Sequence, residues 1–164
     1  MKRFCVLTMI LALLIGASAF AEARHDLTLG NNIVAEGNIV TVPVVITNED
    51  GLMGIDITLK YSEGATLKEV SFENTRVSYF DLKIPMILED ENIVVIGLMK
   101  QMSPEFKPDL AAGTGPVAYL TFEVDDLSEI TIEGTQIPTP HHRNMLIYHH
   151  NVDGLVRQEV VDLQ

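Results

Sequence analysis

The chain has 164 residues, and its 23 Asp and Glu against 11 Lys and Arg give a formal net charge of −12 at neutral pH. Such an acidic surface repels phosphate backbones, which argues against a nucleic-acid partner. The single cysteine, Cys5, excludes an internal disulfide framework and a zinc site built from several thiolates.

The first 21 residues have the pattern of a secretory signal peptide. Lys2 and Arg3 form a positive n-region, and residues 4–16 carry no charge. Small residues precede the predicted cleavage point, which we place after Ala21. The apolar stretch is too short to cross a bilayer about 30 Å thick, so no membrane span is expected after cleavage. We therefore predict a secreted protein, extracellular or periplasmic, with one domain over residues 22–164.

Cleavage would also change the chemistry of the chain. It would remove Cys5 together with Lys2 and Arg3, leaving 143 residues with a net charge of −14. The remaining domain would then be held together by its apolar core alone, because no cysteine is left to cross-link it.

Beyond the signal peptide, the chain consists of short runs rich in Val, Ile and Thr, separated by Gly, Asn, Asp and Pro, as is typical of strands and turns. The run 55–61 alternates strictly between apolar and polar residues, as a half-buried strand does. In the run 39–47, Pro43 suggests an edge or bulge position because it lacks an N–H. The predicted strands are 25–29, 39–47, 55–61, 67–73, one or two between 77 and 88, 93–99, 117–124, 130–133, 145–149 and 155–161.

The connections complete the predicted architecture. Residues 102–115 contain two prolines and two glycines, and we expect a long loop with a short helical turn near Leu110. Residues 151–154 would turn the last two strands into a hairpin. Roughly nine short strands, with turn signals about every 8–12 residues, predict an all-β sandwich with jelly-roll topology.

Several of these strands resemble those of cohesin domains, in the same order along the chain. One of them is a strand in which the apolar–polar alternation ends in Tyr61, and another follows a glycine-rich loop that begins at Gly113. The resemblance implies a nine-stranded jelly roll that binds a protein partner, such as a dockerin-type module, in an extracellular polysaccharide-degrading or surface assembly. The resembling stretches are 40–48, 51–61, 92–99, 113–124 and 153–156.

The resemblance also implies a binding face. Asp56 stands where several cohesins place an acidic residue that hydrogen-bonds the dockerin, whereas Gly54 replaces a polar Asn and Lys100 lies near a position that is often acidic. The run 93–99 is apolar on both faces, so its outer side is a candidate adhesive patch. The predicted partner-binding residues are Asp56, Thr58, Lys60, Val95, Gly97, Met99 and Lys100.

Two other functions are open at the level of sequence. Direct carbohydrate binding would use exposed aromatic rings; the chain has no Trp, and Tyr79, Tyr119 and Tyr148 are the candidate rings. Tyr61 and Phe122 fall instead on predicted core faces. A third hypothesis is that the chain is a structural, secreted β-sandwich that self-associates.

No catalytic motif is present in the sequence, and we predict that the chain is not an enzyme. No cofactor is expected, with calcium as the one alternative. The carboxylate runs 89–91 and 125–126 could supply its oxygen ligands. The pairs His141-His142 and His149-His150 could bind zinc, although neighbouring residues of a strand point to opposite faces. Solvent-exposed turns explain these clusters equally well.

Overall fold

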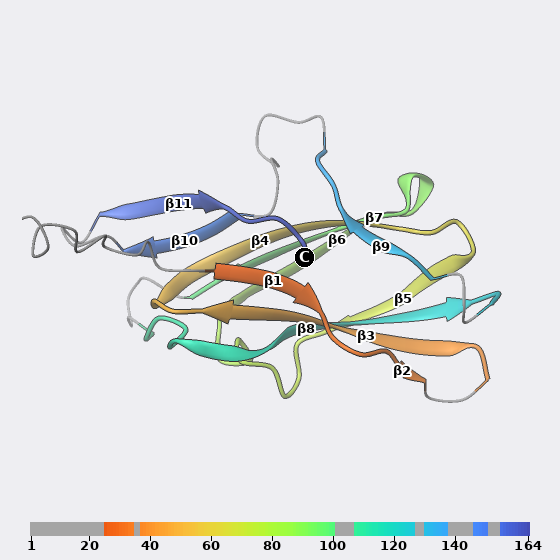
Figure 1. Ribbon diagram of the computed structural model, residues 1–164, viewed down its shortest axis with the longest axis horizontal. Helices are drawn as coiled ribbons and strands as arrows, with labels where there is room; N and C mark the ends of the chain where they lie inside the picture. Colours follow the sequence, from red (N-terminus) through yellow and green to blue (C-terminus); the bar gives the residue numbers. More distant parts are fainter. Residues whose placement is uncertain (1–24, 35–36, 101–106, 127–129, 138–145, 151–154) are drawn as a thin grey trace, which may run out of the picture.

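The structure is a computed structural model, and it describes residues 25–34, 37–100, 107–126, 130–137, 146–150 and 155–164. These residues form two antiparallel sheets that pack face to face (Figure 1). The predicted all-β sandwich with jelly-roll topology is confirmed. No helix in the described ranges is both long and apolar enough to span a membrane. The predicted signal peptide lies outside the described residues.

The first sheet has five strands in the order β1-β3-β8-β5, and the short β2 also pairs with β3. Its long strands β3 and β8 alternate between buried and partly buried residues along most of their length, as the predicted period of two requires. The strands are β1 (His25–Leu29), β2 (Ile33–Val34), β3 (Ile39–Asn48), β5 (Ala65–Ser71) and β8 (Gly113–Val124).

The second sheet has six strands in the order β11-β10-β4-β7-β6, and the short β9 also pairs with β4. A short 3-10 helix, η1 (Glu89–Glu91), connects β6 to β7. The strands are β4 (Leu52–Tyr61), β6 (Leu82–Leu88), β7 (Ile93–Met99), β9 (Ile132–Gly134), β10 (Leu146–His150) and β11 (Val156–Val160). Strands β10 and β11 pair as the predicted hairpin partners, and the predicted turn 151–154 lies outside the described residues.

The main core lies between the two sheets. Phe122 of the first sheet and Tyr61 of the second are both buried, and their rings meet edge to face with centroids 5.3 Å apart. Both therefore lie on the core faces that the sequence predicts. Burial of the inward-facing residues of both sheets is the main stabilising contribution in a chain of this kind.

Pro43 was expected at an edge or a bulge, and the structure contradicts the edge alternative alone. It does not lie in an edge strand, because β3 runs between β1 and β8. The pairing of β3 with β1 ends at Val44, its pairing with β2 begins at Thr41, and Gly30 N–H donates to the Pro43 carbonyl at 2.8 Å. The N–H that proline lacks therefore falls where β1 gives way to β2. A register shift between Val44 and Val45 lies next to it.

Two loop predictions also differ from the structure. Leu110 does not lie in a helical turn; it forms an antiparallel bridge to Leu52, with backbone hydrogen bonds of 2.8 and 3.1 Å. Strand β8 starts at Gly113, four residues before the predicted start at Val117, because the residues of the expected loop continue the pairing with β3. In the stretch 77–88, where one or two strands were expected, a single strand forms, which is β6. The residues that precede β6 form turns.

Candidate functional site

The outer face of the second sheet is where the predicted partner-binding residues come together. In an antiparallel ladder, residues directly opposite one another share a face. Asp56 lies opposite Gly97, and Thr58 lies opposite Val95. Ile84 of β6 lies on the other side of Gly97, so this face runs without interruption from β4 across β7 to β6.

One part of this face is exposed and apolar, and we call it the open half. On this face, four large apolar side chains of β6 and β7 are between 37% and 58% exposed. They lie beside Gly97 and on the β7 side of Asp56, both of which are half-exposed. A strip of this kind next to a carboxylate is typical of a protein-docking surface rather than of an ordinary solvated sheet. The open half consists of Leu82, Ile84, Met86, Asp56, Gly97 and Met99.

Two glycines keep the floor of this face flat. A Cβ on Gly54 would lie 2.8 Å from the Leu98 carbonyl oxygen, which is closer than real Cβ atoms come to backbone atoms. A Cβ on Gly97 would lie 3.6 Å from Asp56 Oδ1, which is an ordinary contact. Gly54 therefore allows the close approach of β4 to β7, whereas Gly97 leaves space that a side chain could fill.

The Gly54→Ala variant is expected to unfold more easily than the native chain, by about 1–3 kcal/mol, because the added methyl group meets a strand backbone that cannot move aside. Urea titration followed by circular dichroism measures the difference. Gly64→Ala is the matched control, since nothing lies within 4 Å of its added Cβ. Equal losses in the two variants would contradict the packing argument.

Tyr148 of β10 holds the carboxylate of Asp56. Its hydroxyl donates to Asp56 Oδ2 at 2.6 Å. Burial raises the pKa of Tyr148 well above its ordinary value, and the hydrogen bond to Asp56 and the charge of that carboxylate raise it further. One oxygen of Asp56 is thereby occupied within the chain.

Replacing Asp56 by Asn is expected to lower the pKa of Tyr148 toward the ordinary tyrosine value, because the variant removes a charge that opposes the phenolate. The contribution of burial remains, so the pKa stays raised in the variant. Alkaline titration of the tyrosine ring carbons by NMR measures the change. An unchanged Tyr148 pKa would show that the carboxylate does not contact this hydroxyl in solution.

The other part of the outer face is covered, and we call it the closed half. It contains Thr58 and Val95, which are 1% and 5% exposed. After β9, the Thr135 N–H donates to the Thr58 carbonyl at 3.0 Å, and the Ile137 side chain packs on Ile93 and Val95. The prediction that Thr58 and Val95 present exposed side chains is therefore wrong, because a segment from elsewhere in the chain covers them.

Two lysines were also predicted on this face. Lys60 is exposed, as expected. Lys100 is 7% exposed, and its ammonium group pairs with the carboxylate of Asp109. The prediction of an accessible Lys100 is wrong, because its side chain is buried against Asp109 and its N–H donates to the Met53 carbonyl at 3.0 Å.

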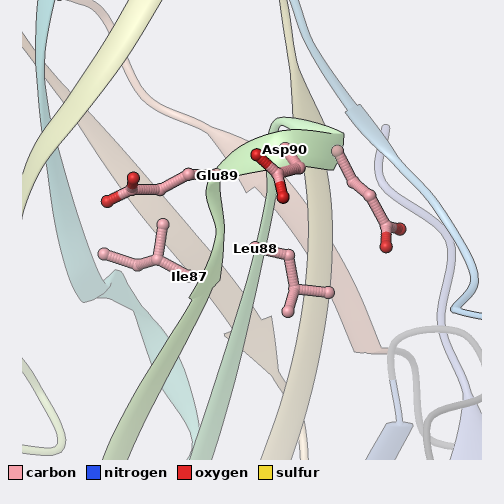
Figure 2. Close-up of a pocket in the computed structure, with 5 residues that line it drawn as sticks. Ile87, Leu88, Glu89 and Asp90 are labelled. Atoms are coloured by element: carbon pink, nitrogen blue, oxygen red, sulfur yellow. The ribbon is translucent and has the colours of Figure 1, made fainter.

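The carboxylates of η1 line a cavity of about 360 Å³ at one end of β6 and β7. Figure 2 shows the side chains of Glu89 and Asp90 extending in different directions from the short helix. Among the described residues, no group of three or more His, Cys, Asp or Glu is placed to hold a metal ion. Calcium binding at residues 89–91 or 125–126 stays a prediction. The lining residues are Ile87, Leu88, Glu89, Asp90 and Glu91.

The histidine pairs fall in two parts of the chain. His149 and His150 end β10, where they pair with Arg157 and Val156 of β11. His141 and His142 lie outside the described residues, so a shared zinc site is not tested.

The candidate sugar-binding rings do not form an open aromatic platform. Tyr79, Tyr119 and Tyr148 are all half-buried. The Tyr79 hydroxyl donates to the Asp109 carbonyl at 3.1 Å, and that of Tyr148 is bonded to Asp56. Tyr119 lies on β8, in the opposite sheet from Tyr148.

Known proteins were compared with this chain by sequence and by structure. No family model matches the sequence, and no curated protein matches it. Among solved structures, the seventh type I cohesin of ScaB from Pseudobacteroides cellulosolvens is similar, with a TM-score of 0.62 and 14% identity over 85% of this chain and 87% of that one. The fold is that of a cohesin module.

Two further cohesins extend the comparison. A non-cellulosomal cohesin from the archaeon Archaeoglobus fulgidus has a TM-score of 0.55 and 19% identity, covering 86% of each chain. The OlpA cohesin of Clostridium thermocellum, solved in complex with the dockerin Doc918, has a TM-score of 0.59 and 13% identity over 85% of this chain and 99% of that one. The predicted resemblance to cohesins is thus confirmed at the level of fold.

Sequence reasoning missed the β6 residues of this outer face and the side chain that covers part of it. The alternation of Leu82, Ile84 and Met86 with Lys83 and Pro85 is a signal that could have placed an apolar row on one side of β6. No comparable signal marks Ile137, which reaches the face from a segment between strands.

Proposed function

We propose that this chain is an exported, non-catalytic recognition module that binds a protein partner of the dockerin type through the outer face of its second sheet. The observation that carries the proposal is the open half, where exposed apolar side chains of β6 and β7 lie beside the carboxylate of Asp56. Cohesins solved in complex with dockerins have this fold, which supports the same class of partner.

The electrostatics of the chain favour a partner that donates hydrogen bonds. The net charge of −12, or −14 after the predicted cleavage, attracts basic surfaces. Asp56 adds a hydrogen-bond acceptor at the β4 border of the apolar strip. The half-buried tyrosines and the lack of Trp favour this function over stacking on a flat polysaccharide.

A binding assay with the full chain tests the proposal. The chain is passed over immobilised dockerin modules and, in parallel, mixed with insoluble cellulose and chitin. We expect retention by at least one dockerin and none by the polysaccharides. Retention by a polysaccharide with no dockerin bound would overturn the proposal in favour of direct carbohydrate binding.

A further inference from the structure

Strand β11 is an outer edge of the second sheet, and within the described part of the chain it pairs with β10 alone (Figure 1). Val156 is 52% exposed and Val160 is 56% exposed, and Arg157 and Gln158 between them are exposed as well. An exposed edge strand presents a row of backbone N–H and C=O groups with which another strand can pair. β11 is therefore a candidate interaction surface, and it lies at the opposite end of the sheet from β6.

Each of the other three outermost strands carries a feature that hinders such pairing. β6 contains Lys83 and also Pro85, which lacks an N–H. β5 is interrupted by a register shift around Lys68. The outer side of β1 is bridged by the end of the chain, where Leu163 pairs with Leu27. Proline, lysine, bulges and covering segments are common protections of sheet edges. β11 contains neither proline nor lysine, and its five residues pair with β10 in unbroken register.

The sequence of β11 is complementary to itself when two copies run antiparallel. It reads Val156-Arg157-Gln158-Glu159-Val160, so a two-fold axis at Gln158 places Arg157 of each copy opposite Glu159 of the other. The same register places Val156 opposite Val160. Opposite charges and β-branched pairs directly across a ladder are both stabilising. An axis at Arg157 or at Glu159 would instead bring like charges together, so the charges favour one register.

The charged pairs and the valine pairs lie on opposite faces of this strand. Glu159 lies opposite the buried Ile147 of β10, and its Oε2 is 3.8 Å from Nε2 of the buried His25. Arg157 and Glu159 therefore lie on the inner side of the sheet. Because successive residues of a strand alternate between faces, the two valines lie on the outer side. A ladder formed by two copies of β11 is thus flanked by favourable contacts on both of its faces.

The charges of β11 favour a second copy of this chain as the occupant of the edge. An interface with two-fold symmetry uses the same patch twice, so its charges must complement themselves, as those of β11 do. The net charge of −12 opposes association at long range. Physiological salt screens charges beyond about 8 Å, however, and pairs in direct contact are screened less.

We propose that two copies of this chain associate through β11, with the strands antiparallel and Gln158 on the two-fold axis. The second sheets of the two copies then form one continuous sheet. The side chains of β6 and β7 in the open half remain uncovered, because those strands lie toward the other end of the sheet. The inference goes beyond the proposed function and does not depend on it, since a dimer can form whether or not a dockerin binds.

Sedimentation velocity of the full chain at physiological salt, over a range of concentrations, tests the proposal. Five residues a side is far fewer than the roughly 20–30 of a stable interface, so we expect a weak dimer with a Kd on the order of 100 µM. The chain should then be a monomer at a few micromolar, where unfolding is measured, and largely a dimer at about 1 mM. A chain that stays monomeric over this whole range would overturn the proposal.

Val156→Asp and Ile33→Asp place the same charge at two equally exposed positions, since the native residues are 52% and 53% exposed. Val156 belongs to the proposed interface, whereas Ile33 of β2 lies in the other sheet. We expect the dimer Kd to rise at least tenfold for Val156→Asp and to stay unchanged for Ile33→Asp. Equal association of the two variants would overturn the proposal, because the contact would then lie elsewhere on the chain.

Charge reversal tests the register. Arg157→Glu should raise the dimer Kd at least tenfold, because like charges then lie opposite one another. Lys60→Glu on β4 changes the net charge by the same amount and should leave the Kd unchanged. Combining Arg157→Glu with Glu159→Arg restores opposite charges across the ladder and should return the Kd to within threefold of the native value. A double variant that associates as weakly as Arg157→Glu would overturn the proposed pairing.

Thermal melting at low concentration verifies that each variant folds. Val160→Asp replaces Val156→Asp if the latter does not fold, and Glu159→Gln replaces the double variant in the same way. Val160→Asp should raise the dimer Kd at least tenfold, and Glu159→Gln about threefold, because the first places a charge against a valine and the second removes one partner of each ion pair. An unchanged Kd in either replacement would overturn the proposal.

Discussion

Replacing Phe122 by Ala is expected to lower the free energy of unfolding by about 3–5 kcal/mol. Phe122 is fully buried on β8, between Val40 of β3 and Leu67 of β5. Its ring also contacts Tyr61 of the opposite sheet, so its removal leaves a cavity that touches both layers. Since domains of this size are stable by only about 5–15 kcal/mol, a loss of this size would leave little stability.

Urea unfolding of the two proteins measures this loss, with an unchanged m-value as the sign that the unfolded states are comparable. Tyr119→Ala is the control on the same strand, because Tyr119 is half-buried and points away from the core. We expect its effect to be less than half that of Phe122→Ala. Equal effects would mean that the core does not lie between the sheets as described.

The Arg76→Ala variant is expected to be destabilised by about 2–4 kcal/mol, because one guanidinium group satisfies oxygens from two segments. Its Nη1 donates to Asn48 Oδ1 and the Gly113 carbonyl, both at 2.8 Å, and to the Ile46 carbonyl at 3.1 Å. Its Nη2 donates to the Ala111 carbonyl at 2.5 Å. The side chain thereby joins the end of β3 to the start of β8.

The conservative variant distinguishes charge from geometry at this site. Arg76→Lys keeps the positive charge but loses the planar fork of donors, so we expect it to recover only part of the stability. Arg157→Ala on the exposed strand β11 is the control and should change stability by less than about 0.5 kcal/mol. Both values come from urea titration. Full recovery by lysine would show that charge alone matters.

The strands were predictable where local pattern and tertiary pairing agree. The runs 25–29 and 93–99 form strands with the predicted bounds. In each of them, alternating or continuous apolar residues are themselves what the core buries. The start of β8 was not predictable in this way, because Gly113 enters the strand through its pairing with Asn48 and not through any β propensity of its own.

The outer face was predictable only in part for a similar reason. Period two correctly placed Asp56 and Thr58 on the same side of β4, with Gly97 and Val95 opposite them. Which of these residues is exposed depends on Ile137, about 40 residues further along the chain than Val95. The burial of Lys100 likewise depends on its ion pair with Asp109. Contacts of these two kinds join residues of different segments, and they leave no local pattern in the sequence.

The central claim is the proposal that this chain, which has the cohesin fold, binds a protein partner of the dockerin type through the open half of its second sheet. The most direct test is the affinity of immobilised dockerin modules for the native chain, Ile84→Asp and Ile33→Asp, measured side by side by surface plasmon resonance. Ile33→Asp is the control, because Ile33 is about as exposed as Ile84, at 53% against 58%, but lies on β2 in the other sheet. The account predicts saturable binding of the native chain, a similar Kd for Ile33→Asp, and at least a tenfold weaker Kd for Ile84→Asp. Binding that is equally strong for all three chains would contradict it.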